Sequence, residues 1–404
     1  MAAVGMVLLS GGVFSTLLGV RGELENLPTL VSGAISAAYY AGFLLGSRFA
    51  LAALGRVGHI RVFATLTALA SVSMLAIGLL GAPVAWMLLR AVTGLCFAGV
   101  YVVAESWLNS LASNEFRGRL LAVYAVIVAA AYGAGQLLVF DLDAQELTGY
   151  AIAAIIASLA VIPVAMSEQA SAPHVERQAT MSLRDLARLV PTGAGTNLLV
   201  GLAHGSLLGM TAIYATREGL SVGRTGLLLA ALQLGGMLMT FPVSAASDDI
   251  DRRVMGVVSC LGVGAGTVLM ILGDATSWTA VPLMVLIGGF SYPLYSIAGA
   301  YTADWLDPEH LSAAASLLVT LYGVGAMIGP FVAAGFMDGF GPDGYLWSVI
   351  CLHGLIALFL VYRIRAWHAP LTTRPWSEVS IPARAFFVPA TIVSMGVRRR
   401  RHGR

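Results

Sequence analysis

Arg90 lies inside a long apolar stretch of this sequence, at about 84–104. It stands roughly seven residues from one end of that stretch, which is ~10 Å along a helix. A charge in the core of a membrane costs at least about 2.5–3.5 kcal/mol, so each such residue is a candidate for function. We therefore predict that Arg90 binds an anion or takes part in proton coupling in a central cavity. The alternative is a structural arginine that caps carbonyl groups or pairs with Glu23.

Two acidic residues stand at equivalent positions, since Glu105 follows the apolar stretch 84–104 and Asp304 follows the stretch 279–302. One interpretation makes Glu105 a partly buried carboxylate that titrates. The other pairs each acid with an arginine from a neighbouring loop, so that the pair closes a cytoplasmic gate and breaks when the gate opens. The residues predicted to form this gate are Arg56, Gly58, Arg61, Glu105, Arg117, Asp248, Arg252, Arg253 and Asp304.

Uncharged polar residues inside apolar stretches are further candidates. His204 is either a neutral, hydrogen-bonded histidine or a proton relay, because histidine titrates near physiological pH. Glutamines in a dry environment need hydrogen-bond partners, and tyrosines can contact an amphipathic substrate. The candidates for substrate binding or proton coupling are Arg90, Glu105, His204, Tyr101, Gln136, Gln233 and Tyr295. His353 is expected to serve packing or to lie at the lipid interface.

The composition shows which solvent these residues face. Of the 404 residues, 58% are hydrophobic and 11% are charged, whereas a soluble chain is about half apolar and a quarter charged. So few charges cannot cover the surface of a soluble protein. This excludes a cytosolic enzyme, a secreted domain and a nucleic-acid binder, and predicts an all-α integral membrane protein.

Twelve stretches are apolar enough to span a membrane, which takes about 20 residues each. They fall into two sets of six, which predict an N-terminal bundle at 1–167 and a C-terminal bundle at 192–363. A polar central loop, 168–191, joins the bundles, and a basic tail occupies 364–404. The spans are expected at about 4–20, 30–50, 62–80, 84–104, 119–139, 149–167, 192–215, 224–244, 255–272, 279–302, 311–335 and 345–363.

The basic residues predict how the chain is oriented. All 23 are arginines, and most of them fall in loops on the same side as the central loop and the tail. Because basic residues concentrate in cytoplasmic loops, both termini are predicted to be cytoplasmic. The first apolar stretch lacks a basic region and a cleavage site, so we expect a retained helix rather than a signal peptide.

The two halves repeat each other. Tyr132-Gly-Ala-Gly recurs as Tyr322-Gly-Val-Gly, and Glu105-Ser-Trp-Leu-Asn recurs with one residue fewer as Asp304-Trp-Leu-Asp. Six spans followed by six related spans are typical of transporters built from two bundles around a midplane cavity. The sequence therefore predicts a pseudo-twofold arrangement.

These motifs resemble the major facilitator superfamily over essentially the whole chain. Its loop after helix 2, Gly-x3-Asp-Arg-x-Gly-x3-Arg, is matched by Arg56, Gly58 and Arg61, but Gly55 stands where the aspartate is expected. The second copy keeps an acid as Asp248, and Arg90 with Gly94 matches the Arg-x3-Gly of helix 4. More narrowly, the chain is similar to the YcaD-like subgroup in the stretches Arg21–Leu24, Arg56–Arg61, Glu105–Asn109 and Arg117–Arg119.

The resemblance implies a secondary transporter of the bacterial inner membrane. We expect a monomer that moves a small molecule by alternating access, coupled to protons, and that exports an amphipathic compound or metabolite. A lipid flippase or scramblase with the same fold and a non-transporting sensor are the alternatives. The Gly-x3-Gly-Pro signature of drug antiporters is missing from the span at 119–139, which weighs against a drug exporter.

Catalytic chemistry is not expected. The sequence lacks His-Glu-x-x-His, Gly-x-Ser-x-Gly and any phosphate-binding loop with a lysine, which are signatures of metalloproteases, serine hydrolases and ATPases. No enzyme activity, cofactor, metal site or nucleic-acid partner is therefore predicted. Cys96, Cys260 and Cys351 lie in apolar stretches without pairing or metal-type spacing, so we expect buried free thiols.

Overall fold

The computed structural model describes residues 1–111, 117–166 and 181–368, and the side chains of 109–111, 117–119, 122 and 308 lie outside that description. The described residues are helical and contain no strands. The first half forms α1 (Ala2–Leu24), α2 (Thr29–Val57), α3 (His59–Leu79), α4 (Pro83–Leu111), α5 (Arg117–Leu137), α6 (Leu147–Leu159) and α7 (Val161–Ala165).

The second half begins with a short helix, α8 (Leu183–Leu189), inside the stretch expected to be a polar loop. The Ser182 side chain and Asp185 cap each other at its start, which satisfies free N–H groups and stabilises a helix of this length. The long helices that follow are α9 (Pro191–Arg217), α10 (Val222–Asp249), α11 (Arg252–Leu272), α12 (Ala280–Ser291), α13 (Pro293–Asp304), α14 (Leu311–Phe340) and α15 (Gly344–Ala366), with a 3-10 turn, η1 (Pro308–His310), before α14.

The helices account for the twelve expected spans. Among the described residues, eleven helical segments are long and apolar enough to cross a membrane, and Val123–Leu137 in α5 is a shorter apolar helix. Two spans differ from a single rod, because α6 and α7 meet at Ala160 and α12 and α13 meet at Tyr292. Pro293 opens α13, whereas Pro242 and Pro330 lie inside uninterrupted helices.

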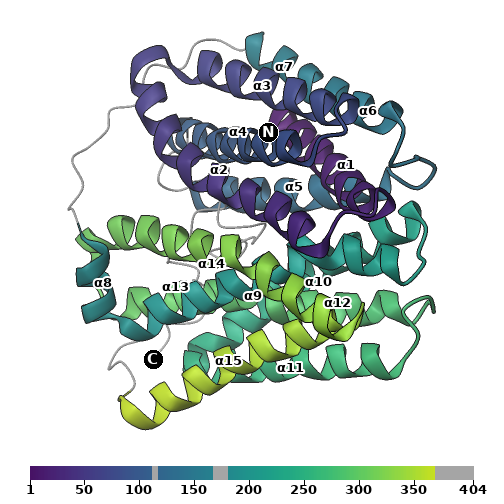
Figure 1. The fold of residues 1–404 in the computed structure, drawn as a ribbon. Coiled ribbons are helices and arrows are strands. Elements are labelled where there is room, and N and C mark those ends of the chain that lie inside the picture. Colours follow the sequence, from purple (N-terminus) through teal and green to yellow (C-terminus); the bar gives the residue numbers. More distant parts are fainter. Residues whose placement is uncertain (112–116, 167–180, 369–404) are drawn as a thin grey trace.

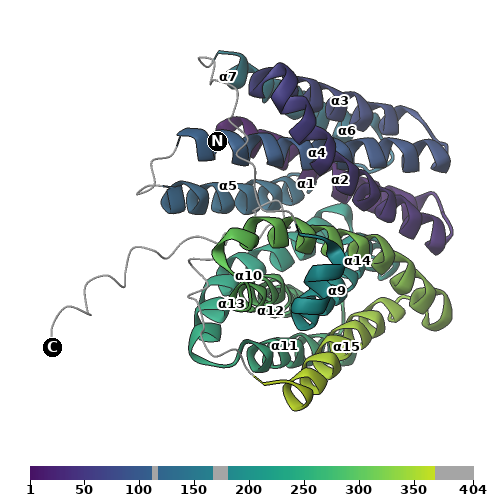
Figure 2. The ribbon, with the colours of Figure 1, turned by 90° about the vertical axis from the view of Figure 1, so that its left-hand side faces the viewer.

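The helices pack in the same order within each half. The pair α1 and α5 corresponds to α9 and α14, and the pair α2 and α4 corresponds to α10 and α12. Between the halves, α2 contacts α14 and α5 contacts α10. Figures 1 and 2 show the first half above the second in two views turned by 90°. We call these halves the N-bundle and the C-bundle, and the division at 167 and 192 stays a prediction.

Glycines let the paired helices touch backbone to backbone, and they do so at equivalent positions. A Cβ added at Gly12 would collide with the Tyr132 carbonyl oxygen, and one added at Gly201 with the Tyr322 carbonyl oxygen. Small residues at such contacts are what allow helices to approach closely in a membrane. The internal repeat seen in the sequence is thus also a repeat of helix packing.

We expect Gly12→Val to lower the thermal unfolding temperature of the detergent-purified protein. The valine would force α1 and α5 apart, and overpacking of this kind costs about 1–3 kcal/mol. Gly264→Val is the matched control, because a side chain added at Gly264 would meet no atom within 4 Å. Equal unfolding temperatures for both variants would show that the α1–α5 contact does not depend on glycine.

Candidate functional site

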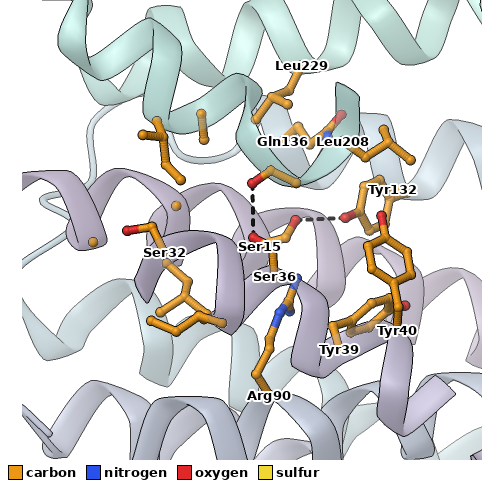
Figure 3. Close-up of a pocket in the computed structure, with 17 residues that line it drawn as sticks. Ser15, Ser32, Ser36, Tyr39, Tyr40, Arg90, Tyr132, Gln136, Leu208 and Leu229 are labelled. Carbon is orange, nitrogen blue, oxygen red and sulfur yellow. Dashed lines mark hydrogen bonds between the residues drawn. The ribbon is translucent and has the colours of Figure 1, made fainter. Parts of the chain in front are cut away.

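A pocket of about 70 Å³ lies between the two bundles. The N-bundle supplies α1, α2, α4 and α5 to its wall, and the C-bundle supplies α9 and α10. Figure 3 shows these side chains converging from helices that are far apart in the sequence. The residues that line it are Ser15, Leu18, Gly19, Gly22, Ser32, Ile35, Ser36, Tyr39, Tyr40, Arg90, Tyr132, Gln136, Leu208, Gly209, Ala212, Ile213 and Leu229.

Arg90 is the one cation among the described residues that line the pocket. Its Cζ atom lies 4.6 Å from the centroid of the Tyr39 ring and 5.3 Å from that of Phe14, and such cation–π contacts hold a guanidinium in place without neutralising it. Within the described part of the chain, Arg90 forms no ion pair. Glu23, the partner considered from the sequence, instead bonds to Arg217. The pocket therefore carries a positive charge that no described acidic side chain neutralises.

Polar side chains surround this charge. Ser15 Oγ and Tyr132 Oη are 2.8 Å apart, and Ser36 Oγ donates to the Gly209 carbonyl oxygen at 3.0 Å, across the boundary between the bundles (Figure 3). Gln136 is 3% exposed, and its Oε1 atom has no hydrogen-bond partner among the described residues. A buried polar atom left unpaired costs free energy, so Gln136 offers a hydrogen bond to whatever enters.

The bundles are held together at one end of the pocket. We call the end of the molecule where α1 begins the inner end and the opposite end the outer end, following the predicted orientation. Arg217, the last residue of α9, bonds to Glu23 Oε1 at 2.8 Å and to Thr29 Oγ1 at 2.9 Å. A Cβ added at Gly33 would lie 3.4 Å from the Ala334 Cβ. All these contacts between bundles lie in the outer halves of their helices.

We expect Arg217→Ala to expose the pocket from the outer end. The Arg217–Glu23 pair is partly exposed, with both side chains at 20%, and pairs of this kind contribute up to about 1 kcal/mol. Labelling of a Ser32→Cys reporter by a membrane-impermeant thiol reagent should therefore become about 2- to 5-fold faster. Arg48→Ala, on the part of α2 away from the outer end, serves as the control. If the labelling rate in Arg217→Ala were unchanged, Arg217 would not contribute to closing the outer end.

The C-bundle contains a second group of polar side chains, which lies outside the pocket lining. His204 is 1% exposed, with Nδ1 2.9 Å from Tyr322 Oη and Nε2 3.1 Å from the Ser291 carbonyl oxygen. A carbonyl oxygen accepts only, so Nε2 carries the proton and Tyr322 donates to Nδ1. His353, expected to serve packing or lie at the lipid interface, is also buried, and its Nε2 is 2.9 Å from Ser291 Oγ.

The same sites in the two repeats hold different chemistry. Ser15 with Tyr132 in the N-bundle corresponds to His204 with Tyr322 in the C-bundle. The predicted candidates Gln233 and Tyr295 also lie in the C-bundle, where Tyr292 donates to Gln233 Oε1 at 3.0 Å and the Tyr295 ring packs edge-on against Tyr322 at 5.2 Å.

The inner end of the C-bundle holds a buried ion pair. Arg252 Nε bonds to Asp304 Oδ2 at 2.7 Å, with side chains 1% and 0% exposed, and Arg252 Nη1 bonds to Asp248 at 2.9 Å. Beside it, Arg253 pairs with Asp251 at 2.7 Å. Burial raises the pKa of the Asp251 carboxyl, but the hydrogen bonds from Arg253 outweigh this and hold the pKa below its ordinary value. Asp304 is thus paired with the arginine that begins α11.

The inner end of the N-bundle is built differently. Gly55 stands where the second repeat has Asp248, and His59, which is 3.1 Å from Ser106 Oγ, stands where it has Arg252. Arg56 and Arg61 are exposed and form no ion pair in the ranges that the structure describes. Gly58 has a φ of 82°, and Glu105 is half-buried. The Tyr101 ring packs 6.2 Å from the Phe43 ring. The side chain of Arg117 lies outside the described residues.

The structure thus brings Arg90 and Gln136 together and leaves the other predicted candidates elsewhere. It adds Ser15, Ser36, Tyr39, Tyr40 and Tyr132 to the pocket and Arg217 to its closure. The sequence shows these tyrosines as polar groups in apolar spans, but it does not indicate which of the many tyrosines line the pocket. The role of each predicted residue in the site and the gate stays a prediction.

Two bundles of repeated helices with a polar pocket between them define a membrane transporter of the two-bundle type. The family model of the Major Facilitator Superfamily matches residues 193–401, which is more than half of the chain. The protein belongs to the Major Facilitator Superfamily, a family of transporters rather than enzymes.

Relatives and solved structures agree with this assignment. An uncharacterized MFS-type transporter, YcaD, of Escherichia fergusonii is 26% identical over 93% of this chain and 98% of its own. YcaD of Salmonella newport is 27% identical over 89% of this chain and 93% of its own. The nucleoside transporter NupG superposes with a TM-score of 0.72 at 12% identity, over 91% of this chain and 98% of its own. The second structure is a bacterial homologue of the human lysosomal transporter Spinster in an inward-facing and occupied conformation. It superposes with a TM-score of 0.69 at 15% identity, over 90% of this chain and 96% of its own. At these identities the two solved structures share the fold, and the chain is a multi-pass membrane protein of the YcaD-like group.

Proposed function

We propose that this protein is a secondary active transporter that moves a small molecule by alternating access around the Arg90 pocket. The observation that carries the proposal is the position of this pocket. Both bundles line it, and a charge with no ion-pair partner in the described residues lies in its wall. A site shared by two bundles changes when they rock against each other, which is how such transporters expose a site to each side in turn.

The distribution of contacts between the bundles supports the same mechanism. The Arg217–Glu23 pair, the Ser36–Gly209 hydrogen bond and the α2–α14 contact at Gly33 all lie in the outer halves of their helices. This fits a state in which the outer end is closed. The buried Arg252–Asp304 pair lies within the C-bundle at the inner end, where we propose that it forms part of the inner gate.

Protons are the proposed coupling ion, as expected from the sequence. The described residues of the pocket lining include no carboxylate. A coupled proton would therefore bind outside it, and Glu105 and His204 are the proposed carriers. Export of an amphipathic compound or metabolite, cytoplasmic termini and a monomeric state complete the proposal, carried over from the sequence.

Proton flux in proteoliposomes that contain a pH-sensitive dye tests this function. Pooled organic anions, amphipathic cations and sugars are added in turn, with Glu105→Gln and protein-free vesicles as controls. A pool-dependent pH change that Glu105→Gln abolishes is expected. Movement of labelled lipid headgroups without flux of any pool would favour the flippase alternative, and the absence of both would favour the sensor.

A further inference from the structure

We propose that the substrate is a small monocarboxylate whose carboxylate group binds Arg90 and whose hydrogen-bonding substituent binds Gln136. This inference rests on the proposed transport function and names the substrate class of the same pocket. The charge of the lining, the unpaired amide atom and the size of the pocket carry it independently.

The charge of the lining sets the charge of the ligand. Among the lining residues Arg90 is the one that carries a full charge at neutral pH, and its guanidinium has no acceptor in the described residues. The rings of Tyr39 and Phe14 hold the guanidinium in place, while its N–H donors stay available. One guanidinium matches one carboxylate in both charge and geometry, because it can donate two parallel hydrogen bonds. A dianionic phosphate would leave one charge uncompensated in a membrane, which is costly.

Gln136 points to a second polar group on the ligand. Its side chain lines the pocket, is 3% exposed and has one amide atom without a partner among the described residues. Ser32 Oγ is likewise buried and unpaired in the described part of the pocket wall. A ligand with a hydroxyl beside its carboxylate would donate to Gln136 Oε1 or pair with Ser32 Oγ, whereas a purely apolar body would leave these atoms unpaired.

The size and the remaining lining limit the body of the ligand. The pocket volume of about 70 Å³ is far below the 300–1,000 Å³ of pockets for drug-sized ligands. Leu18, Ile35, Leu208 and Ile213 supply apolar surface. The pocket therefore suits a compound of a few carbon atoms better than a drug.

An anionic substrate also has a preferred direction. With the inside of the cell negative, the membrane potential drives a monovalent anion outward by a concentration ratio of roughly 50-fold per 100 mV. Uptake of the same anion would need at least one accompanying proton to cancel its charge. The substrate class thus agrees with export.

Compounds of equal size and different charge test the substrate class. We would measure binding to the detergent-purified protein by ligand-induced shifts in thermal unfolding, and transport by counterflow in proteoliposomes. The probes are propionate, propionamide and propylammonium, together with lactate and lactamide. Propionate and lactate are expected to bind and move, with lactate binding more tightly. Arg90→Gln should weaken both at least about tenfold, and Gln136→Leu should remove the preference for lactate.

Each outcome separates this inference from the transport function on which it rests. Transport of propionamide or propylammonium without binding of either carboxylate would overturn the substrate class and leave the transporter intact. Binding of carboxylates without counterflow would keep the class and overturn the transport function. Failure of both carboxylates to bind a folded wild-type protein would also overturn the inference. Arg224→Ala, which removes an arginine that lies 4.7 Å from the Trp278 ring outside the pocket, should bind as the wild type does.

Discussion

Replacing Arg90 by alanine should reduce substrate-dependent flux in proteoliposomes by at least about tenfold. The substitution removes the one full charge of the pocket lining. Hydrogen bonds to a charged group contribute about 1.5–3 kcal/mol, and each 1.4 kcal/mol is a factor of ten in binding. The fold should survive the substitution, because it removes only contacts with the rings of Tyr39 and Phe14. In the described part of the chain it leaves no acidic residue without an ion-pair partner.

Two further variants separate charge from geometry at this position. Arg90→Lys keeps the positive charge but loses the fork of parallel donors, so its flux should fall between those of the wild type and Arg90→Ala. Arg224→Ala removes a guanidinium that also lies over an aromatic ring, near Trp278 and outside the pocket, and should transport normally. Wild-type flux in Arg90→Ala, with normal folding, would move the substrate site elsewhere.

Asp304→Ala should destabilise the protein by about 3 kcal/mol. The Asp304 side chain is 0% exposed and lies 2.7 Å from Arg252, itself 1% exposed. Removing one member of a buried pair leaves a charge without its partner and costs about 3–5 kcal/mol. The effect should lie at the lower end of that range, because Asp248 still bonds to Arg252. Denaturant or thermal unfolding of the purified protein measures it.

A matched control and a double variant define what this loss means. Asp249→Ala removes an exposed carboxylate one residue after Asp248 and should change the unfolding free energy by less than about 0.5 kcal/mol. Replacing both Arg252 and Asp304 by apolar residues should recover much of the stability, since a buried pair is often exchangeable for apolar packing. If Asp304→Ala were as stable as Asp249→Ala, the pair would not contribute to the C-bundle.

Much of the fold follows from the sequence, because a stretch of about 20 apolar residues predicts a membrane-spanning helix. All twelve expected spans have helical counterparts, including the span broken at Pro293. The repeat of Tyr132-Gly and Tyr322-Gly also predicted equivalent packing, since a glycine contact recurs at the carbonyl oxygens of both tyrosines. The short helix α8 was missed because its capping pair, Ser182 and Asp185, lies in a segment that looks polar throughout.

The sequence predicted residues of the candidate site only where the residue type is unusual for an apolar span. Arg90 and Gln136 are unusual in apolar spans, and both line the pocket. Tyr39 and Tyr40 share their type with many other tyrosines, so only packing distinguishes them. The partner of Glu23 could not be inferred, because Arg217 is far away in sequence and reaches it only when the bundles meet. Cys351 proved exposed rather than buried, because its helix turns that face away from the bundle.

A reversible cross-link between the bundles tests alternating access most directly. Gly33 in α2 and Ala334 in α14 belong to different bundles and lie outside the pocket lining, and their Cβ positions are 3.4 Å apart. Disulfides usually have Cβ atoms about 3.5–4.5 Å apart, and this separation lies within about 0.1 Å of that range, so Gly33→Cys with Ala334→Cys should form one on oxidation. The native cysteines, which are free, would first be replaced. Gly5→Cys with Ala131→Cys, at 3.9 Å within the N-bundle, is the control pair.

Oxidation should stop transport in the Gly33–Ala334 pair, and reduction should restore it, because the outer end can no longer open while the disulfide holds. The Gly5–Ala131 pair should transport equally well in both states, since the N-bundle moves as a unit. Undiminished transport by protein whose Gly33–Ala334 cross-link is complete would contradict alternating access around the Arg90 pocket.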